Sequence, residues 1–394
     1  MSPEFFIKAG QLLLSLSILV VLHELGHFIP AKLFGTRVEK FYLFFDIKYS
    51  LFKKKVGETV YGIGWLPLGG YVKIAGMIDE SFDKEQMSKP PQPWEFRSKP
   101  AWQRLIIMLG GVTVNLAVGF IIYMMVLFIW GKETLPQENF PLGMQPSSVV
   151  QKIGFEKGDK IIDVDGKEID NVLDINKMLL FRPIEYVTVE KSNGSLSEIL
   201  IPSDLGSEIF KSGQINSFIP IFPAEIDSVV PDSPALNSGL ESGDKILSVN
   251  DEIINDWGAF SNWLDNNSDD IINLVIERNN SIYTISIDRN DDGTIGVFPA
   301  FNFESTNEKL GLTESIIEGF DYGYWVLYEY VSGFQFLVTK EGAQQLGGFG
   351  TIGNIFPAKW DWKGFWLSTA LISIILAFMN VLPIPALDGG HVMF

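Results

Sequence analysis

The sequence predicts a multi-span α-helical membrane protein with a strand-rich loop and two tandem domains of mixed α and β structure. Three observations lead to this fold class. Long apolar runs alternate with charged segments along the 394 residues, basic residues are concentrated in one of these segments, and one motif occurs twice in the middle of the chain. There is no cysteine, so disulfide bonds and thiolate metal sites are excluded.

The first apolar run, about residues 5–33, is predicted to be an uncleaved membrane helix within a segment 1–34 whose N-terminus lies outside. Its length is sufficient to cross a bilayer. A signal peptide is the alternative, but no small-residue cleavage site follows the run, and the run itself contains a metal-binding motif.

That motif is His23-Glu24-x-x-His27. Two histidines four positions apart share one face of a helix and can bind one metal ion, while Glu24 can reach a metal-bound water and act as general base. The alternative is a set of polar side chains that reach the membrane surface from the end of a helix. It is disfavoured because ionisable groups at membrane depth are costly unless they are paired or functional.

Residues 35–100 are predicted to form a cytoplasmic segment. From Lys32 to Arg104 the chain has 13 Lys and Arg against 8 Asp and Glu, whereas the remainder has 17 against 40. An excess of basic residues between two spans is typical of a cytoplasmic loop. The acidic remainder is predicted to lie outside, and it argues against nucleic acid as a partner.

Within this segment, residues 38–76 are predicted to form strands. Aromatic and β-branched runs alternate there with Gly and Pro, which favours strands and hairpins over a helix. Such a hairpin enters a membrane only where protein or a water-filled cavity covers its backbone. The alternative is a small peripheral sheet on the membrane surface. The polar, Pro-rich stretch 79–100 is typical of a linker.

The second span is predicted at Ala101–Trp130, within a segment 101–131. Gly110 and Gly111 allow close helix packing. The amide of Asn115 needs a polar partner at this depth, which is either a neighbouring helix or the catalytic site. The sequence does not decide between these two.

Two tandem domains, 132–221 and 222–302, are predicted from an internal repeat. The motif that begins at Pro146 recurs at Pro231, an offset of 85 residues that holds at each matched position. This spacing is a domain length rather than a solenoid period. Each copy predicts a short helix ended by Gly, a Gly-Asp turn, a strand and a hairpin turn.

Residues 303–363 are predicted to form an amphipathic segment on the outer membrane surface, over 311–340, and a Gly-rich connector, over 346–354. The third span, about 366–382 within 364–394, ends in Asn380-x-x-Pro383-x-Pro385-x-x-Asp388-Gly389. Because a hydrophobic segment ends the printed sequence, we expect a fourth span to follow it.

Asp388 is the candidate for a third metal ligand, since zinc bound by two histidines needs one more protein ligand and an open position. If the three spans alternate in direction, the end of the third span lies on the same side as His23 and His27. The alternative role for Asp388 is that of a turn residue that caps the next segment.

Together these motifs resemble the site-2 protease family of intramembrane zinc metalloproteases. The repeats resemble PDZ domains, and with Pro67-Leu-Gly69-Gly70-Tyr71 they are similar to the regulator-of-sigma-E protease branch. One departure concerns the second span. The family has Gly-Pro-x-x-Asn, and here the place of Pro is taken by Gly111 or Val112, depending on register.

The resemblance implies one Zn²⁺ per chain, bound by His23, His27 and Asp388, with Glu24 as the catalytic base. It implies a membrane-reentrant β-loop at residues 38–76. Four further residues are candidates for substrate or oxyanion contacts, namely Asn115, Asn380, Gly69 and Gly70.

The activity implied is intramembrane proteolysis of single-span membrane proteins, such as anti-sigma factors or remnant signal peptides, after a first cleavage outside. The location implied is the bacterial inner membrane, with the PDZ-like domains on the extracytoplasmic side as a size filter and lipid as a further partner. A substrate helix must unwind before attack, and pairing with an edge strand of the reentrant sheet would hold it extended.

Two other classes of function remain open. One is a membrane-anchored PDZ scaffold, which would have no need for Glu24. The other is a metal transporter, which would supply ligands along a pathway, whereas the sequence shows one cluster.

Overall fold

The computed structural model describes residues 2–67, 69–77, 90–290, 292–301, 303–337, 353–384 and 387–393. The chain forms two compact units: a helical unit, Met1–Lys132 with Lys309–Phe394, and a repeat unit, Glu133–Glu308. Pro385, residues 79–89 of the predicted linker 79–100 and residues 346–352 of the predicted connector 346–354 lie outside the described residues.

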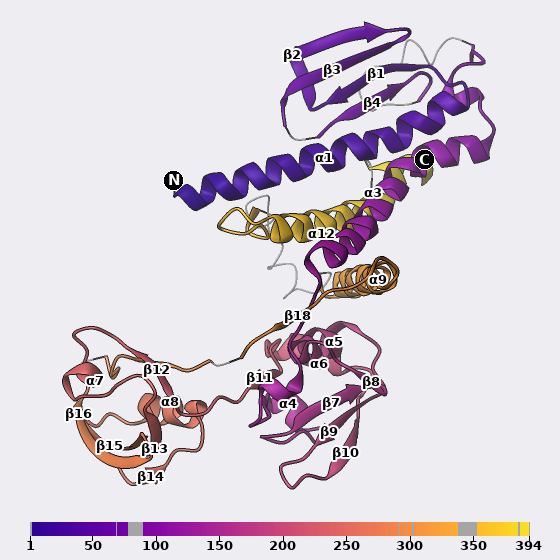
Figure 1. Cartoon of the computed structure of the whole chain (residues 1–394). Coiled ribbons are helices and arrows are strands. Elements are labelled where there is room, and N and C mark those ends of the chain that lie inside the picture. Colours follow the sequence, from indigo (N-terminus) through magenta and orange to yellow (C-terminus); the bar gives the residue numbers. More distant parts are fainter. Residues whose placement is uncertain are drawn as a thin grey trace. The chain divides into compact units, whose positions relative to one another are not determined.

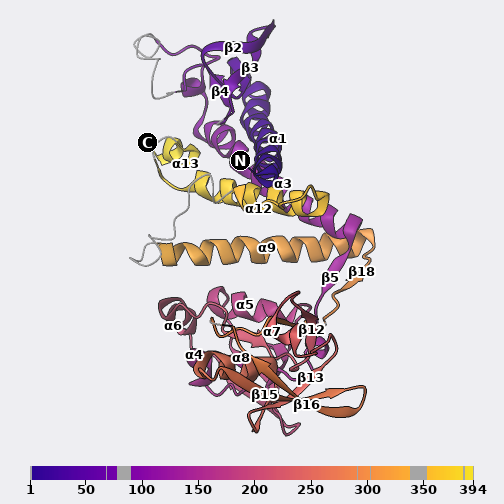
Figure 2. The ribbon, with the colours of Figure 1, turned by 90° about the vertical axis from the view of Figure 1, so that its left-hand side faces the viewer.

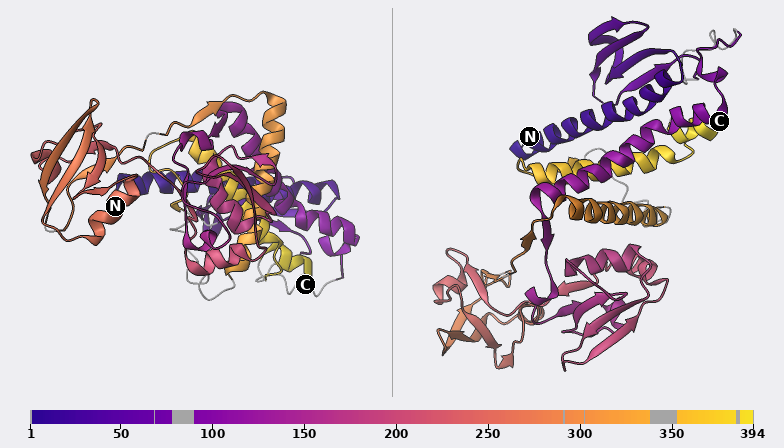
Figure 3. Two further views of the ribbon diagram at one scale, coloured as in Figure 1. Left: turned by 90° about the horizontal axis from the view of Figure 1, so that it is seen from below. Right: turned by 45° about the vertical axis from the view of Figure 1, so that its right-hand side comes forward.

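Three helices of the helical unit are long and apolar enough to cross a membrane, namely α1 (Pro3–Leu33), α3 (Ala101–Trp130) and α12 (Trp362–Val381). They coincide with the three predicted spans in position and apolar length. The central helix α3 packs against both α1 and α12, and the three lie side by side in the right panel of Figure 3. The short helix α13 (Asp388–Met393) follows α12.

The predicted amphipathic segment forms the helix α9 (Leu312–Leu337), which packs against α3. Unlike the three candidate spans found among the described residues, α9 does not meet the composition expected of a membrane-spanning helix. Helices α3 and α12 are held together by a cluster of buried side chains. Its members are Ile122, Tyr123, Val126, Ala370 and Ile374.

The strands predicted between residues 38 and 76 are present. They form one four-stranded sheet in the order β2–β3–β1–β4, in which β1 and β3 are parallel and the other pairs are antiparallel. Figure 2 shows the sheet beside α1. A buried cluster of Ala31, Val38, Ile74 and Ile107 fixes the sheet to α1 and α3. The strand bounds are β1 Val38–Leu43, β2 Phe45–Val56, β3 Thr59–Leu66 and β4 Tyr71–Ile74, and the turn η1 covers Phe96–Ser98.

The repeat unit contains two copies of one topology, which confirms the internal repeat (Figure 1). The sheet β8–β7–β9–β10 of the first copy matches β14–β13–β15–β16 of the second, and the strand pair β6–β11 matches β12–β17. The predicted hairpin turns are present, with positive φ at Asp165 and Gly166 and at Asn250 and Asp251. Among the described residues, α6 has no counterpart in the second copy.

The elements of the first copy are η2 Gln137–Asn139, β6 Met144–Pro146, α4 Ser148–Gln151, β7 Lys160–Val164, β8 Lys167–Glu168, η3 Val172–Asp174, α5 Ile175–Phe181, β9 Tyr186–Glu190, β10 Leu196–Leu200, α6 Leu205–Ser212 and β11 Phe218–Pro220. Those of the second are β12 Ile226–Val229, α7 Pro234–Asn237, β13 Lys245–Val249, β14 Glu252–Ile253, α8 Trp257–Asn266, β15 Ile271–Arg278, β16 Ser281–Asp288 and β17 Val297–Pro299. Two short strands, β5 Lys132–Thr134 and β18 Thr306–Glu308, pair with each other.

Candidate metal centre

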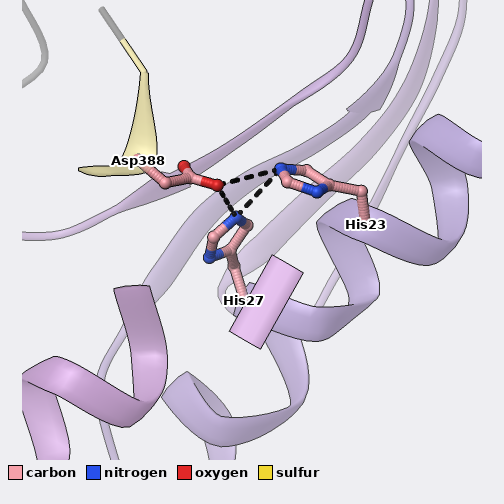
Figure 4. A group of neighbouring side chains, drawn as sticks. All are labelled: His23, His27 and Asp388. Carbon is pink, nitrogen blue, oxygen red and sulfur yellow. Dashed lines mark hydrogen bonds and ion pairs between the residues drawn. The ribbon is translucent and has the colours of Figure 1, made fainter. Parts of the chain in front are cut away.

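Three potential metal ligands converge in the helical unit, as Figure 4 shows. His23 and His27 come from successive turns of α1, and Asp388 is the first residue of α13. Asp388 Oδ2 lies 3.3 Å from His23 Nε2 and 3.4 Å from His27 Nε2, and the two Nε2 atoms are 3.2 Å apart. Asp388 therefore meets the two histidines although about 360 residues separate it from them in the sequence.

These distances fit a tetrahedral zinc ion. Zinc bonds to nitrogen and oxygen of about 2.0–2.2 Å require neighbouring ligand atoms to lie about 3.3 Å apart. Asp388 Oδ2 is moreover buried without a hydrogen-bond partner among the described residues, which is costly unless a cation satisfies it. The residues present thus fit a zinc site with one open position.

The orientation of His27 leaves its Nε2 available for a metal. Its Nδ1 lies 2.8 Å from the main-chain oxygen of Ile107 on α3. A carbonyl oxygen can only accept, so Nδ1 carries the proton and donates it, and Nε2 keeps its lone pair. His27 is 8% exposed, which holds the ring in this orientation.

Glycines allow α1 and α3 to pack closely and leave space for the metal ligands between them. A Cβ on Gly26 would lie 2.4 Å from the carbonyl oxygen of Gly110, so these helices are in backbone contact. A Cβ on Gly111 would lie 2.4 Å from His27 Nε2 and 2.6 Å from His23 Cε1. The space beside the two imidazoles therefore exists because Gly111 has no side chain.

Asn115 faces the same site from the next turn of α3. It is 1% exposed, and its Nδ2 lies 3.2 Å from Nδ1 of His23. Its main-chain oxygen also accepts a hydrogen bond of 2.6 Å from Ser373 of α12. Both partners left open by the sequence are therefore present.

The other candidate residues lie at different distances from this site. Glu24 follows His23 on α1, and a Cβ on Gly70 would lie 3.5 Å from Glu24 Cγ, so the chain before β4 passes directly beside Glu24. Gly69, at φ 149°, adjoins the ring of Phe45 instead. Asn380 lies in the last turn of α12, and in the described part of the chain no hydrogen bond joins it to the three ligands.

Comparison with known proteins identifies the family of this chain. The profile of peptidase family M50 matches residues 11–394. The chain belongs to peptidase family M50. It is 26% identical to the regulator of sigma E protease of Haemophilus influenzae over 99% of this chain and 90% of that protein. It is 27% identical to protease RseP of Yersinia pestis, over 97% of this chain and 88% of that protein. This M50 peptidase is therefore a metalloprotease with apolar, span-length helices.

Two contributors to the M50 site carried no usable sequence signal. Ile107 acts through its main-chain oxygen, which every residue has, so nothing distinguishes it in the sequence. Gly26 occupies one of the two free positions of the His-Glu-x-x-His pattern. The Gly110-Gly111 pair did indicate close packing, but not that Gly111 faces the histidines.

Proposed function

We propose that this M50 peptidase hydrolyses peptide bonds of single-span membrane proteins in the bacterial inner membrane. In this proposal His23, His27 and Asp388 bind one zinc ion, and Glu24 is the general base. The observation that carries it is the tetrahedral spacing of three ligand atoms, two of them on a helix that is long and apolar enough to span a membrane.

The chemistry divides between the metal and Glu24. When bound, zinc polarises the scissile carbonyl and makes water a stronger nucleophile. Glu24 is one residue beyond His23, about 100° further round the helix, so it does not share the ligand face closely enough to be the third ligand. From there its carboxylate takes the proton of the attacking water and returns it to the leaving amine.

The position of β4 supports the proposal that the substrate binds in an extended conformation. This strand is at the edge of its sheet, and Gly70, just before it, is adjacent to Glu24. A membrane helix has its backbone hydrogen bonds satisfied internally, so it must unwind before attack, and strand addition would hold it extended. We propose that residues 38–76 form a membrane-reentrant loop with this role and that Asn380 contacts the oxyanion.

The substrate class follows from the relatives. Because one of them is named regulator of sigma E protease, we propose a single-span anti-sigma factor, or a remnant signal peptide, already cleaved on its outer side. We propose further that the two repeats are PDZ-like domains that exclude bulky substrates. The chain's three histidines all lie outside residues 133–308, which supports a role for the repeats in access rather than chemistry.

The test uses Glu24→Gln, which keeps the size of the side chain and removes the proton acceptor. We expect zinc content to stay at one per chain while cleavage of a membrane-embedded substrate falls by roughly 10²–10⁴-fold. Asp388→Ala should instead lose zinc. Zinc by elemental analysis and cleavage in detergent micelles measure the two effects separately.

Glu4→Gln is the matched control, since Glu4 lies in the first turn of the same helix and is exposed. It should change neither quantity. A Glu24→Gln protein that retains zinc and cleaves normally would favour the non-catalytic scaffold. The transporter hypothesis is disfavoured because a transporter would have several metal-binding clusters along a pathway. The described residues contain one cluster of His and carboxylate side chains suited to a metal.

A further inference from the structure

We infer that Asn115 is a positioning residue that accepts a hydrogen bond from Nδ1–H of His23 and thereby directs Nε2 of His23 to the metal. This role differs from that of a substrate or oxyanion contact. It deepens the proposed metal site and rests on it. The argument starts from the ring nitrogen that each histidine turns toward Asp388.

Metal binding fixes which nitrogen of His23 carries a proton. The atom of His23 that completes the tetrahedral spacing is Nε2, 3.3 Å from Asp388 Oδ2. A neutral imidazole binds a metal through the nitrogen that lacks a proton, so the proton must be on Nδ1. The group 3.2 Å from Nδ1 must then be an acceptor.

The amide of Asn115 supplies that acceptor when its oxygen faces the ring. In the structure, Nδ2 of Asn115 faces Nδ1 of His23, and the buried Oδ1 has no partner among the described residues. A half-turn of the amide exchanges the two atoms. Either orientation leaves one end of the amide without a described partner, so the count of hydrogen bonds does not choose between them. Metal ligation by Nε2 does choose, because it requires Oδ1 at Nδ1.

The same helix then orients both histidines. His27 donates its Nδ1–H to the main-chain oxygen of Ile107, and His23 donates its own to Asn115. Ile107, Gly111 and Asn115 are spaced by four residues and share one face of α3. To the two rings α3 thus presents the main-chain oxygen of Ile107, the space left by the missing side chain of Gly111, and the side-chain oxygen of Asn115.

Asn115 is held firmly enough to orient a neighbour. It is 1% exposed, and the hydroxyl of the fully buried Ser373 donates to its main-chain oxygen. The contact connects α12 to α3, and Asn115 connects α3 to His23 on α1. Groups that hydrogen-bond to the second nitrogen of a metal-bound histidine fix its tautomer, and their loss typically weakens metal binding roughly 10–100-fold.

The experiment compares the zinc affinities of Asn115→Leu and Asn115→Asp, measured by competition with a chelator. Leu is similar in size but accepts no hydrogen bond, so zinc affinity should fall about 10–100-fold. Asp offers oxygen in both orientations, so affinity should equal or exceed that of the wild type. Thr113→Val, two residues away on an exposed face of α3, should leave affinity unchanged.

Three outcomes would overturn the inference. Asn115→Leu could bind zinc normally and yet lose cleavage, which would show an oxyanion or substrate role. Asn115→Leu and Asn115→Asp could lose affinity equally, which would show a packing role. A wild-type protein that binds no zinc would overturn the proposed metal site together with this inference, whereas the first two outcomes leave the metal site intact.

A measurement on the zinc-loaded wild type does not depend on any variant folding. The chain has three histidines, so ¹⁵N labelling of histidine gives a spectrum that is simple to assign. We expect His23 to carry its proton on Nδ1 and to bind zinc through Nε2. Binding through Nδ1 would contradict the inference directly.

Discussion

At the scale of single residues, the metal site depends on the missing side chain of Gly111 as much as on the ligands. The two imidazoles approach α3 so closely that the position of a Cβ on Gly111 would lie within 2.4 Å of His27 Nε2. The contact is with ligand atoms that the metal needs in place, so they cannot give way without loss of the tetrahedral spacing.

We therefore expect Gly111→Ala to reduce zinc affinity by about 100-fold, the upper end of the losses typical when groups around metal ligands are changed, with the three helices still formed. Gly10→Ala is the control, because a Cβ there meets nothing within 4 Å and alanine favours a helix by up to about 1 kcal/mol. Chelator competition and helix content by circular dichroism check both. Normal zinc affinity in Gly111→Ala would mean that the rings lie further from α3.

The residues of the site differ in how far the sequence could predict them. The pairing of His23 and His27 follows from helix periodicity, and Glu24 was singled out by its place in the His-Glu-x-x-His motif. Asp388 required an argument about the direction of each span, and the structure brings it to the two histidines. The contact of Asn115 with His23 could not be predicted, because it depends on the rotation of α3 against α1.

At the scale of elements, the Gly-Asp turn that recurs in the sequence is explained by a buried ion pair. Asp244 is fully buried, accepts the main-chain N–H of Glu241 and is bound at 2.6 Å by Arg278 of β15. In the first copy, Asp159 is bound at 2.9 Å by Lys191. The repeated motif therefore fixes a turn against a strand, which is a structural role.

Replacing Asp244 by Ala should destabilise the second copy by about 3 kcal/mol, because it leaves the guanidinium of Arg278 without its buried partner. Asp265→Ala, at an exposed position of α8, should change stability by less than about 0.5 kcal/mol. Hydrogen exchange of β13 and β15 in the full chain measures both. Unchanged exchange in Asp244→Ala would show that the turn is held by its backbone alone.

Elements defined by local pattern were predictable, and their pairing was not. The three spans follow from apolar length, and the short helices, turns and hairpins of the repeats follow from Gly and Asp positions. The parallel pairing of β1 with β3, and the place of β4 at the edge beside α1, depend on contacts between residues far apart in sequence. Hydrophobic periodicity contains no information on that order.

At the scale of the whole molecule, charge separates the chain into parts with different expected environments. Residues 32–104 carry 13 basic against 8 acidic side chains, and the remainder carries 17 against 40. Three of those basic residues, Lys53, Lys54 and Lys55, are exposed together at the end of β2. By the positive-inside rule the sheet should face the cytoplasm. A size filter that acts on externally cleaved substrates requires the repeats on the other side.

Single cysteines test this topology cleanly, because the chain has none of its own. We expect Lys54→Cys in β2 to react with a membrane-impermeant maleimide only after the cells are opened. Asn193→Cys, in the turn between β9 and β10, should react in intact cells whose outer envelope is permeabilised. Both positions are exposed, so the fold itself does not prevent the reagent from reaching either cysteine. Labelling of both from one side would contradict the charge argument and remove the basis for a size filter, while the metal site in α1, α3 and α13 would be unaffected.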